Sequence, residues 1–352
     1  MKDIFKNIKP VDASFFNAKL DKTDYTLLNK ISFPKNELPN TKIALLGIGE
    51  GLVSLRKSLY EMYFYNDLSI SDLGNIAISD KSKLLPILKT LLSKNIFTIL
   101  IGNTVDVSDI CFDALVETKK NISASIVTPS IRNTSTLSRF LDKKDKLFNL
   151  NLLGYQTYLS DPAIMKELSS NYFETLRLGK LREDSKSYEP ALRDSDFLTM
   201  DLASIKRSEI PDSSTSGVNG LYSEEICLIS RYAGISDNLK IVNLFNNNFE
   251  EKGQLSELTA QIIWHIVDGY VHRAHENMLN NVNGIEKILV NLESPETQLV
   301  FYHSRITNRW WMEVQGKKPT IVACSDEDYK TACKHDIPLR WVWYQQKMTN
   351  KN

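Results

Sequence analysis

The stretch FLTMDLASIKRS, residues 197–208, has the pattern of a buried strand that ends in a polar turn. In α/β enzymes, metal-binding carboxylates are often placed at such a strand end. Only one carboxylate is present here, that of Asp201, and it is followed at the second and fifth positions by Ala203 and Lys206. One carboxylate cannot hold a pair of metal ions, because each ion needs several oxygen or imidazole ligands. The stretch therefore indicates either a site that has lost its ligands or an ordinary polar strand end.

A second group with metal-binding side chains lies in WHIVDGYVHRAHE, residues 264–276. His265, Asp268, His272 and His275 would share one face of a helix, and the opposite stripe is apolar. We therefore expect the apolar stripe to face the core and the histidines to lie on the outer polar face. No serine-histidine-acid set can be assembled, because all five histidines lie at residue 265 or later and none follows a nucleophile elbow.

The loop GIGEG, residues 47–51, follows an apolar run and precedes a helical pattern, as a dinucleotide-binding loop does. Leu52 stands at the place of the third glycine, and its side chain would block close packing of helix and strand. Cofactor binding is therefore the weaker interpretation of this loop. The four cysteines form no C-x-x-C pair and are expected to be small core residues.

The composition excludes several classes of protein. Across 352 residues, Lys plus Arg balance Asp plus Glu at 43 each, so no net field would attract nucleic acid. The N-terminal residues contain no apolar signal region, and the apolar run NIFTILIG is too short to cross a bilayer. We expect a reduced, cytoplasmic protein that neither binds nucleic acid nor inserts into a membrane.

Short, nearly continuous apolar runs alternate with longer amphipathic segments along most of the chain. Six runs predict buried strands, at residues 42–49, 95–102, 123–129, 150–156, 196–202 and 239–245. Five segments between them predict helices, at residues 53–64, 83–94, 108–120, 161–170 and 223–234. This alternation is typical of an α/β domain with a mostly parallel sheet. We place that domain at residues 35–290, after an N-terminal segment of residues 1–34.

Residues 291–352 form a predicted C-terminal extension that is rich in tryptophan. RWWMEV and PTIVAC predict a β-hairpin, and Ser325 with Asp328 has the spacing of a capping box that starts a short helix. Aromatic side chains next to arginine either dock such an extension on the core or bind a partner, and both interpretations remain open. The candidate partner-binding residues are Trp310, Trp311, Arg340, Trp341, Trp343 and Tyr344.

Three segments carry a resemblance to a known family. SLRKSLYEMYF resembles a G-P-x-x-I-R helix, and TILIGNTVDVSD resembles a strand with Gly-Gly-Asp-His-Ser. DFLTMDLASIKRSEIPDSSTSGVNGLYSEE resembles a Ser-x-Asp-x-Asp-x-x-Asp-Pro strand followed by a Gly-Gly-Leu helix start. These are motifs of the arginase/agmatinase/formimidoylglutamase family, the ureohydrolases, and the similarity runs from TKIALLGIG to AQIIWHIVDGY. It implies a three-layer α/β/α fold, which in that family carries two manganese ions at the C-terminal edge of the sheet.

Aligned with those motifs, the first metal ligands of the family are replaced in this sequence. Thr104 stands where the family has its first histidine ligand, with Asn103 before it in place of an aspartate. Thr128, Ser130 and Arg132 stand at the three ligands of Asp-Ala-His-Ala-Asp. No histidine precedes residue 265, so a shifted alignment cannot restore the imidazoles.

The last motif retains one ligand. Asp201 is kept, whereas Ala203 and Lys206 stand at the second and third aspartates, and Asn243 stands at the glutamate that grips the guanidinium group. The resemblance therefore implies a vacated metal site. We expect Asp201 to pair there with a basic or hydroxyl group, the nearest candidates being Lys206, Arg132 and Thr128.

We therefore predict a catalytically inactive ureohydrolase-like protein without metal or other cofactor, which binds or scaffolds protein partners. One alternative is a divergent hydrolase of guanidino or amidino compounds that works without the usual metals. A weaker alternative is a nucleotide-binding protein that uses GIGEG. The resemblance is compatible with a homo-oligomer, because trimers and hexamers are common in the family.

Overall fold

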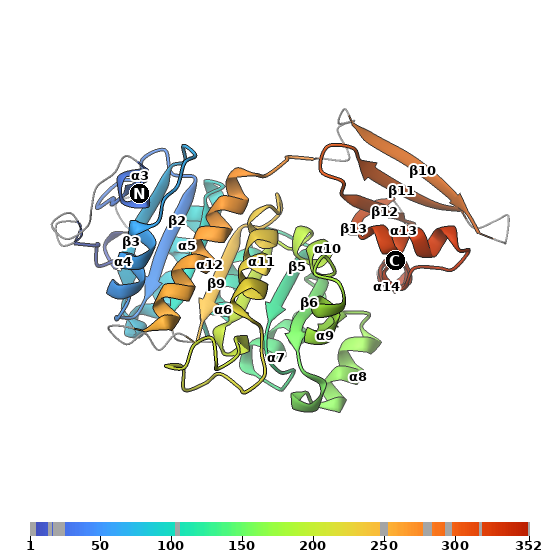
Figure 1. The fold of residues 1–352 in the computed structure, drawn as a ribbon, viewed down its shortest axis with the longest axis horizontal. Coiled ribbons are helices and arrows are strands. Elements are labelled where there is room, and N and C mark those ends of the chain that lie inside the picture. Colours follow the sequence, from blue (N-terminus) through green and yellow to red (C-terminus); the bar gives the residue numbers. More distant parts are fainter. Residues whose placement is uncertain are drawn as a thin grey trace.

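The computed structural model describes residues 5–12, 16, 25–102, 106–246, 253–276, 284–292, 298–316 and 319–350. These residues form a nine-stranded sheet between two layers of helices, and a separate four-stranded sheet near the C-terminus (Figure 1). The predicted α/β/α class with a small C-terminal α+β extension is confirmed. Among the described residues, none of the helices combines the length and the apolar character that crossing a lipid bilayer requires.

All neighbouring strands of the large sheet run parallel, in the order β1-β3-β2-β4-β9-β8-β5-β6-β7. Their bounds are β1 Ile31–Ser32, β2 Ile43–Ile48, β3 Ile70–Ile76, β4 Phe97–Gly102, β5 Ile122–Val127, β6 Leu147–Tyr155, β7 Glu174–Arg177, β8 Phe197–Asp201 and β9 Ile241–Phe245. The six predicted strands are confirmed. The sequence pattern missed β1, β3 and β7, because β1 and β7 are short and β3 is interrupted by Asp72 and Asn75.

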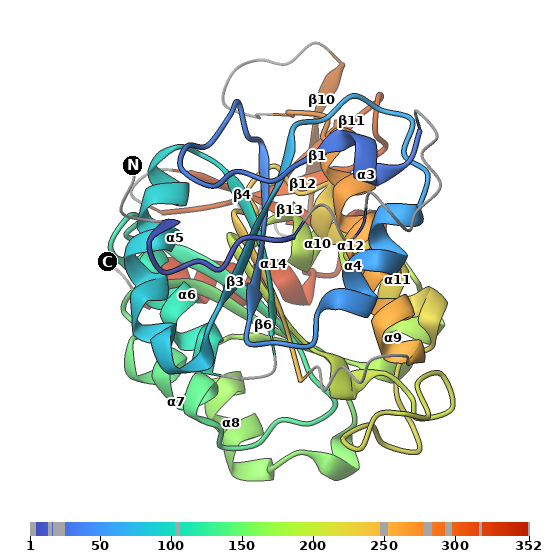
Figure 2. The same ribbon diagram turned by 90° about the vertical axis from the view of Figure 1, so that its left-hand side faces the viewer.

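Helices cover both faces of this sheet (Figure 2). One face packs against α3 Leu27–Lys30, α4 Val53–Glu61, α9 Leu178–Glu183, α10 Glu189–Arg193, α11 Ser223–Gly234 and α12 Gln254–Val271. The other packs against α5 Leu84–Ser93, α6 Asp106–Val116, α7 Ser135–Asp142 and α8 Pro162–Ser170. Short 3-10 turns are η1 Ile78–Lys83, η2 Thr157–Leu159 and η3 Leu202–Ser204. Each helix buries its apolar stripe against the sheet, as the amphipathic patterns predicted.

Two long helices approach each other closely where glycines face each other. A Cβ atom added to Gly234 of α11 would lie 2.8 Å from the Cα atom of Gly269 of α12. A larger side chain at either position would force these helices apart. Because α11 and α12 together cover β8 and β9, this contact helps to fix the strands that carry Asp201 and Asn243.

The extension forms its own antiparallel sheet, in the order β10-β11-β12-β13, with two helices. Its elements are β10 Ile285–Asn291, β11 Gln298–Ser304, β12 Trp310–Val314, β13 Thr320–Cys324, α13 Asp326–Cys333 and α14 Leu339–Asn350. The predicted hairpin is confirmed as β12 and β13, and the predicted capping box at Ser325 and Asp328 starts α13. The sheet begins at Ile285, ahead of the limit at residue 290 that the sequence pattern gave.

Candidate functional site

The described positions of the expected metal site gather at one edge of the large sheet. Thr128 follows β5, Asp201 ends β8, and Asn246 follows β9. Since β5, β8 and β9 are parallel neighbours, their carboxyl ends open on the same edge, where open α/β sheets bind ligands. Asn103 and Thr104, which the alignment also places at this edge, lie outside the described residues.

Asp201 has amide partners instead of ionic ones. Its Oδ1 accepts hydrogen bonds from Asn246 Nδ2 at 2.8 Å and from the main-chain nitrogen of Ala203 at 2.9 Å. Burial raises the pKa of Asp201, and the two hydrogen bonds oppose part of that rise. Asn246 reaches the carboxylate because Phe245, the residue before it, is level with Asp201 in the strand register. Within the described residues, the expected pairing of Asp201 with a basic or hydroxyl group is therefore not found.

The three expected partners are engaged elsewhere. Lys206 Nζ lies 5.0 Å from the ring centroid of Tyr222, at the start of α11. Arg132 Nε donates to a main-chain carbonyl oxygen of η2 at 3.1 Å. Thr128 Oγ1 donates to the carbonyl oxygen of Ser130 at 2.9 Å. Hydrogen bonds thus hold the loop after β5 to itself and to η2. Lys206, in the loop after β8, contacts the start of α11.

The described side chains at this edge do not fit a pair of manganese ions. Ala203 offers no donor atom, Arg132 is a cation, and Thr128 and Ser130 offer neutral hydroxyl groups where the resembled family has carboxylates and imidazoles. In the part of the chain that the structure describes, no three His, Cys, Asp or Glu side chains come together so as to hold a metal ion. The described donor atoms at this edge therefore supply no ligand set for metal-assisted hydrolysis.

Asn243 lies below the edge, in the middle of β9. It is fully buried and in register with Thr199, two residues before Asp201. Its Nδ2 donates to Ser108 Oγ at 2.9 Å and to Thr199 Oγ1 at 3.3 Å, and its Oδ1 has no hydrogen-bond partner among the described residues. Asn243, which the alignment places at the substrate-gripping glutamate of the resembled family, therefore lies inside the sheet and not at its edge. It belongs to a small polar layer under α6.

The histidine group divides between a helix and a loop. Helix α12 ends at Val271, so His272 caps it, and His275 lies beyond it with a φ of 52°. Asp268 forms an ion pair with Arg231, and its carbonyl oxygen is 2.7 Å from His272 Nδ1. The expectation of one shared helical face is thus wrong for His275, whereas the exposed position of both histidines agrees with an outer polar surface.

The side chain of Leu52 packs closely against the glycine loop after β2. Leu52 is buried, and a Cβ atom on Gly47 would lie 2.4 Å from Leu52 Cδ1. The nearby cavity of about 500 Å³ includes Arg56 in its lining, but that guanidinium is held by Asp72 at 2.8 Å. The arginine that lines this cavity is thus already paired.

The partner-binding candidates of the extension mostly make contacts within the chain. Trp310 stacks between His303 and Tyr329, and Trp341 Nε1 donates to the carbonyl oxygen of Glu313 at 2.9 Å. The other four candidates are buried or half-buried, and three of them face the core. These three are Trp311, Arg340 and Tyr344, while Trp343 is half-buried.

One part of the contact between extension and core is a buried ionic and aromatic cluster beside β6 and β7. Arg340 Nη2 lies 2.6 Å from Glu174 Oε1, and both side chains are buried. The ring of Tyr344 stacks on Phe148 at 5.5 Å, and its hydroxyl accepts a hydrogen bond from Asn149 Nδ2 at 3.0 Å. Burial raises the pKa of Glu174, and Arg340 opposes that rise. This cluster holds α14 against the core.

Another part of the contact, just before β8 at the same edge of the sheet, was missed by sequence reasoning. Arg193 Nη2 donates to the carbonyl oxygens of Trp310 and Cys324, and its guanidinium lies 4.4 Å from the ring centroid of Trp311. Asp194 Oδ2 accepts a hydrogen bond from the main-chain nitrogen of Ala323 at 2.7 Å. The sequence signal for this contact is the pair of charged residues Arg193 and Asp194, which shortly precede a strand that is covered on both faces.

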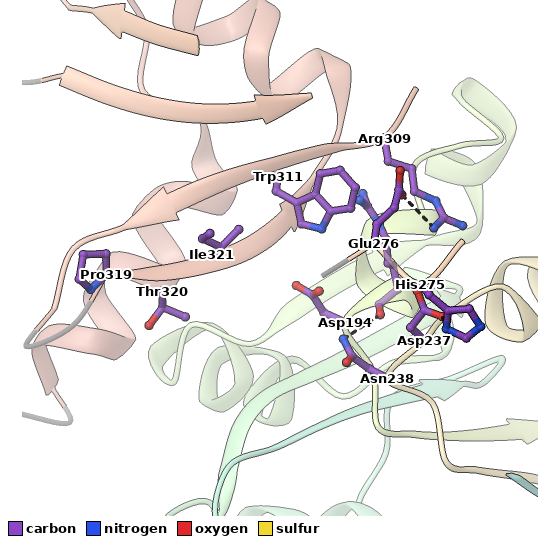
Figure 3. Close-up of a pocket in the computed structure, with 11 residues that line it drawn as sticks. Asp194, Asp237, Asn238, His275, Glu276, Arg309, Trp311, Pro319, Thr320 and Ile321 are labelled. Carbon is purple, nitrogen blue, oxygen red and sulfur yellow. Dashed lines mark hydrogen bonds and ion pairs between the residues drawn. The ribbon is translucent and has the colours of Figure 1, made fainter. Parts of the chain in front are cut away.

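A cavity of about 770 Å³ lies between the α/β core and the C-terminal extension (Figure 3). Its walls come from the end of α10, the loop before β9, the segment after α12, and the strands β12 and β13. Figure 3 shows Asp194, Asn238 and Asp237 on the core side and Trp311, Thr320 and Ile321 on the side of the extension. None of the residues aligned with the metal ligands lines this cavity.

Solved structures of known proteins share this fold. Formimidoylglutamase from Bacillus subtilis subsp. subtilis str. 168 matches with a TM-score of 0.62 and 16% identity, over 73% of this chain and 95% of that one. Trypanosoma cruzi formiminoglutamase with Mn²⁺ matches at 0.62 and 17%, over 70% and 99% of the two chains. Agmatine ureohydrolase of Thermoplasma volcanium matches at 0.54 and 14%, over 74% and 99%. No family model and no curated protein matches the sequence. The chain therefore has the arginase-like α/β/α fold.

Proposed function

We propose that this chain, which has the arginase-like fold, is catalytically inactive and acts as a protein-binding or scaffolding component. The observation that carries the proposal is the environment of Asp201. This one retained carboxylate is held by Asn246 and a main-chain amide, and the neighbouring ligand positions carry Thr128, Ser130, Arg132 and Ala203. Hydrolysis of a guanidinium or formimino group by a metal-bound hydroxide needs several anionic or imidazole ligands, which these residues do not supply.

The binding role is supported by the extension. Its antiparallel sheet stands to one side of the α/β core (Figure 1), and Leu289 on β10 and Ile306 after β11 are 53% and 71% exposed. Trp343 of α14 is half-buried. Exposed apolar and aromatic side chains of this kind form the centres of protein interfaces. We place partner contacts at Leu289 and Trp343, which lie on opposite faces of the small sheet, and at Ile306, because most of the other aromatic candidates are already packed within the chain.

The first prediction is that the purified protein holds no stoichiometric manganese and releases no product from guanidino or formimino substrates. The test is elemental analysis after dialysis against manganese chloride, with parallel assays on arginine, agmatine and formimidoylglutamate. Asp201→Asn is the matched variant, because it removes the retained carboxylate and keeps an oxygen acceptor. Two manganese ions per chain, or turnover that Asp201→Asn abolishes, would overturn the proposal.

A second candidate function, a metal-independent hydrolase, is favoured by one observation. Burial raises the pKa of Asp201 at a sheet edge, and a raised carboxyl pKa is a property of general acids and bases. The same assays separate this candidate, since metal-free turnover would follow the titration of Asp201 and vanish in Asp201→Asn.

A further inference from the structure

The cavity between extension and core lies at the opposite edge of the large sheet from Asp201. Asp194 and Asn238 line it from positions just before β8 and β9, whereas Asp201 ends β8. Its volume of about 770 Å³ falls in the range of small-molecule sites, which occur preferentially at the boundary between two structural units. Any ligand of this cavity is therefore separate from the chemistry of the resembled family.

The positive charges in the cavity wall are already neutralised. Arg193 donates to two main-chain carbonyl oxygens, and its Nε lies 3.0 Å from Glu189 Oε1. Arg309 lies 3.6 Å from carboxylate oxygens of both Glu189 and Glu276. These two guanidinium groups hold the extension in place, and an anionic ligand would have to compete with their carboxylates.

Among the acidic groups that line the cavity, Asp194 has an oxygen, Oδ1, that accepts no hydrogen bond from the described residues. Among the described residues it has no salt-bridge partner, and its one side-chain hydrogen bond, to the amide of Ala323, uses Oδ2. Asp237, also in the wall, lies 3.0 Å from the exposed His275. The charges of Arg193 and Arg340 offset only part of the cost of burying this carboxylate, and a ligand cation that pairs with it directly would offset more of that cost.

The wall opposite Asp194 is mostly apolar. Trp311, Pro319 and Ile321 line it, together with the hydroxyl-bearing Thr320 (Figure 3). We infer that this cavity binds a small organic amine, whose ammonium group pairs with Asp194 and whose apolar body lies against Trp311 and Ile321. Aromatic and carboxylate groups together are the usual surroundings of a bound organic cation.

Three fragments test the assignment, because they share a phenethyl body and carry a cationic, a neutral or an anionic head group. Phenethylamine, phenethyl alcohol and phenylpropionate are titrated into the full-length protein by calorimetry at matched ionic strength. We expect heat and a raised melting temperature with the amine alone. Equal binding of the alcohol, or no binding of the amine, would overturn the inference.

The anchor is tested by Asp194→Asn, which keeps the acceptor for Ala323 and removes the charge. We expect the dissociation constant of the amine to rise at least about tenfold, as loss of a charged hydrogen bond requires. Asp145→Asn, an exposed site away from the cavity, is the control and should leave binding unchanged.

A second variant, Thr320→Lys, puts a cation into the opposite wall and should also abolish binding, which covers the case that Asp194→Asn fails to fold. Unchanged affinity in either variant contradicts the assignment. Neither outcome bears on the proposed inactivity, which concerns the other edge of the sheet.

Discussion

At the scale of single residues, Asp194 gives the chain a specific dependence on pH. Burial raises its pKa to about 6, whereas an unfolded aspartate titrates near about 4. Between these values the native state binds more protons than the unfolded state, so the contribution of Asp194 to the free energy of unfolding falls as pH rises through this window. Above it, the ionised carboxyl destabilises the native state.

We therefore predict that Asp194→Asn raises the free energy of unfolding above the window, by up to about 3 kcal/mol for a shift of two pKa units. Below about pH 4 the gain should disappear, because the carboxyl is then protonated in the unfolded state as well as in the native state. Urea denaturation of both proteins across this range measures the difference. A gain that is independent of pH would show that the carboxyl is not the cause.

The replacement of metal ligands remains a prediction from the resemblance, because it depends only on residue identity at each aligned motif position. The partner of Asp201 could not be predicted. Asn246 lies 45 residues away, and its contact depends on the register that places Phe245 level with Asp201. Asn243 was misplaced for the same reason, since a five-residue strand has no sequence signal for which residue reaches the edge.

At the scale of elements, long buried strands were predictable and short or interrupted ones were not. β2 and β4 are apolar throughout, so both follow from their patterns. β7 has only four residues and includes Glu174, which is buried there by Arg340 from a helix far along the chain. Such a residue has the sequence pattern of a surface loop, and only the docked helix α14 makes it part of the interior.

Arg340→Ala should release α14 from β7. The variant leaves Glu174 buried without its cation, and loss of one partner of a buried ion pair costs about 3–5 kcal/mol. Hydrogen exchange should increase in α14 and β7 and stay low in β2 and β4. Adding Glu174→Leu to the variant should recover part of the loss, because no buried charge then remains unpaired. Uniform exchange across the chain would show that the extension is not held at this point.

At the scale of the whole molecule, the extension has two separable roles. Trp341 and Trp343 are both half-buried, but Trp341 packs against the small core and donates a hydrogen bond to the carbonyl oxygen of Glu313, whereas Trp343 belongs to the proposed partner contacts. We predict that Trp341→Ala lowers stability by about 3–5 kcal/mol, as loss of a packed tryptophan does. Trp343→Ala should change stability less and weaken capture of a partner from the native cell by about 2 kcal/mol or more. A thermal melt beside a pull-down measures both. Equal loss of stability with unchanged capture would assign Trp343 to internal packing.

The strand order also sets a sequence of events in folding. β4 and β5 are consecutive in the chain, yet β9 and β8 lie between them in the sheet, and Thr98 pairs with Ile241. During synthesis, the half-sheets β1-β3-β2-β4 and β5-β6-β7 can form first, each with an open edge toward the gap. Pairings between residues this distant in the sequence form slowly. Until they form, the open strand edges can pair with the wrong strand or with another chain. The strands that carry Asp201 and Asn243 complete the sheet, so the carboxyl edge around Asp201 exists only after the chain has been made past residue 245.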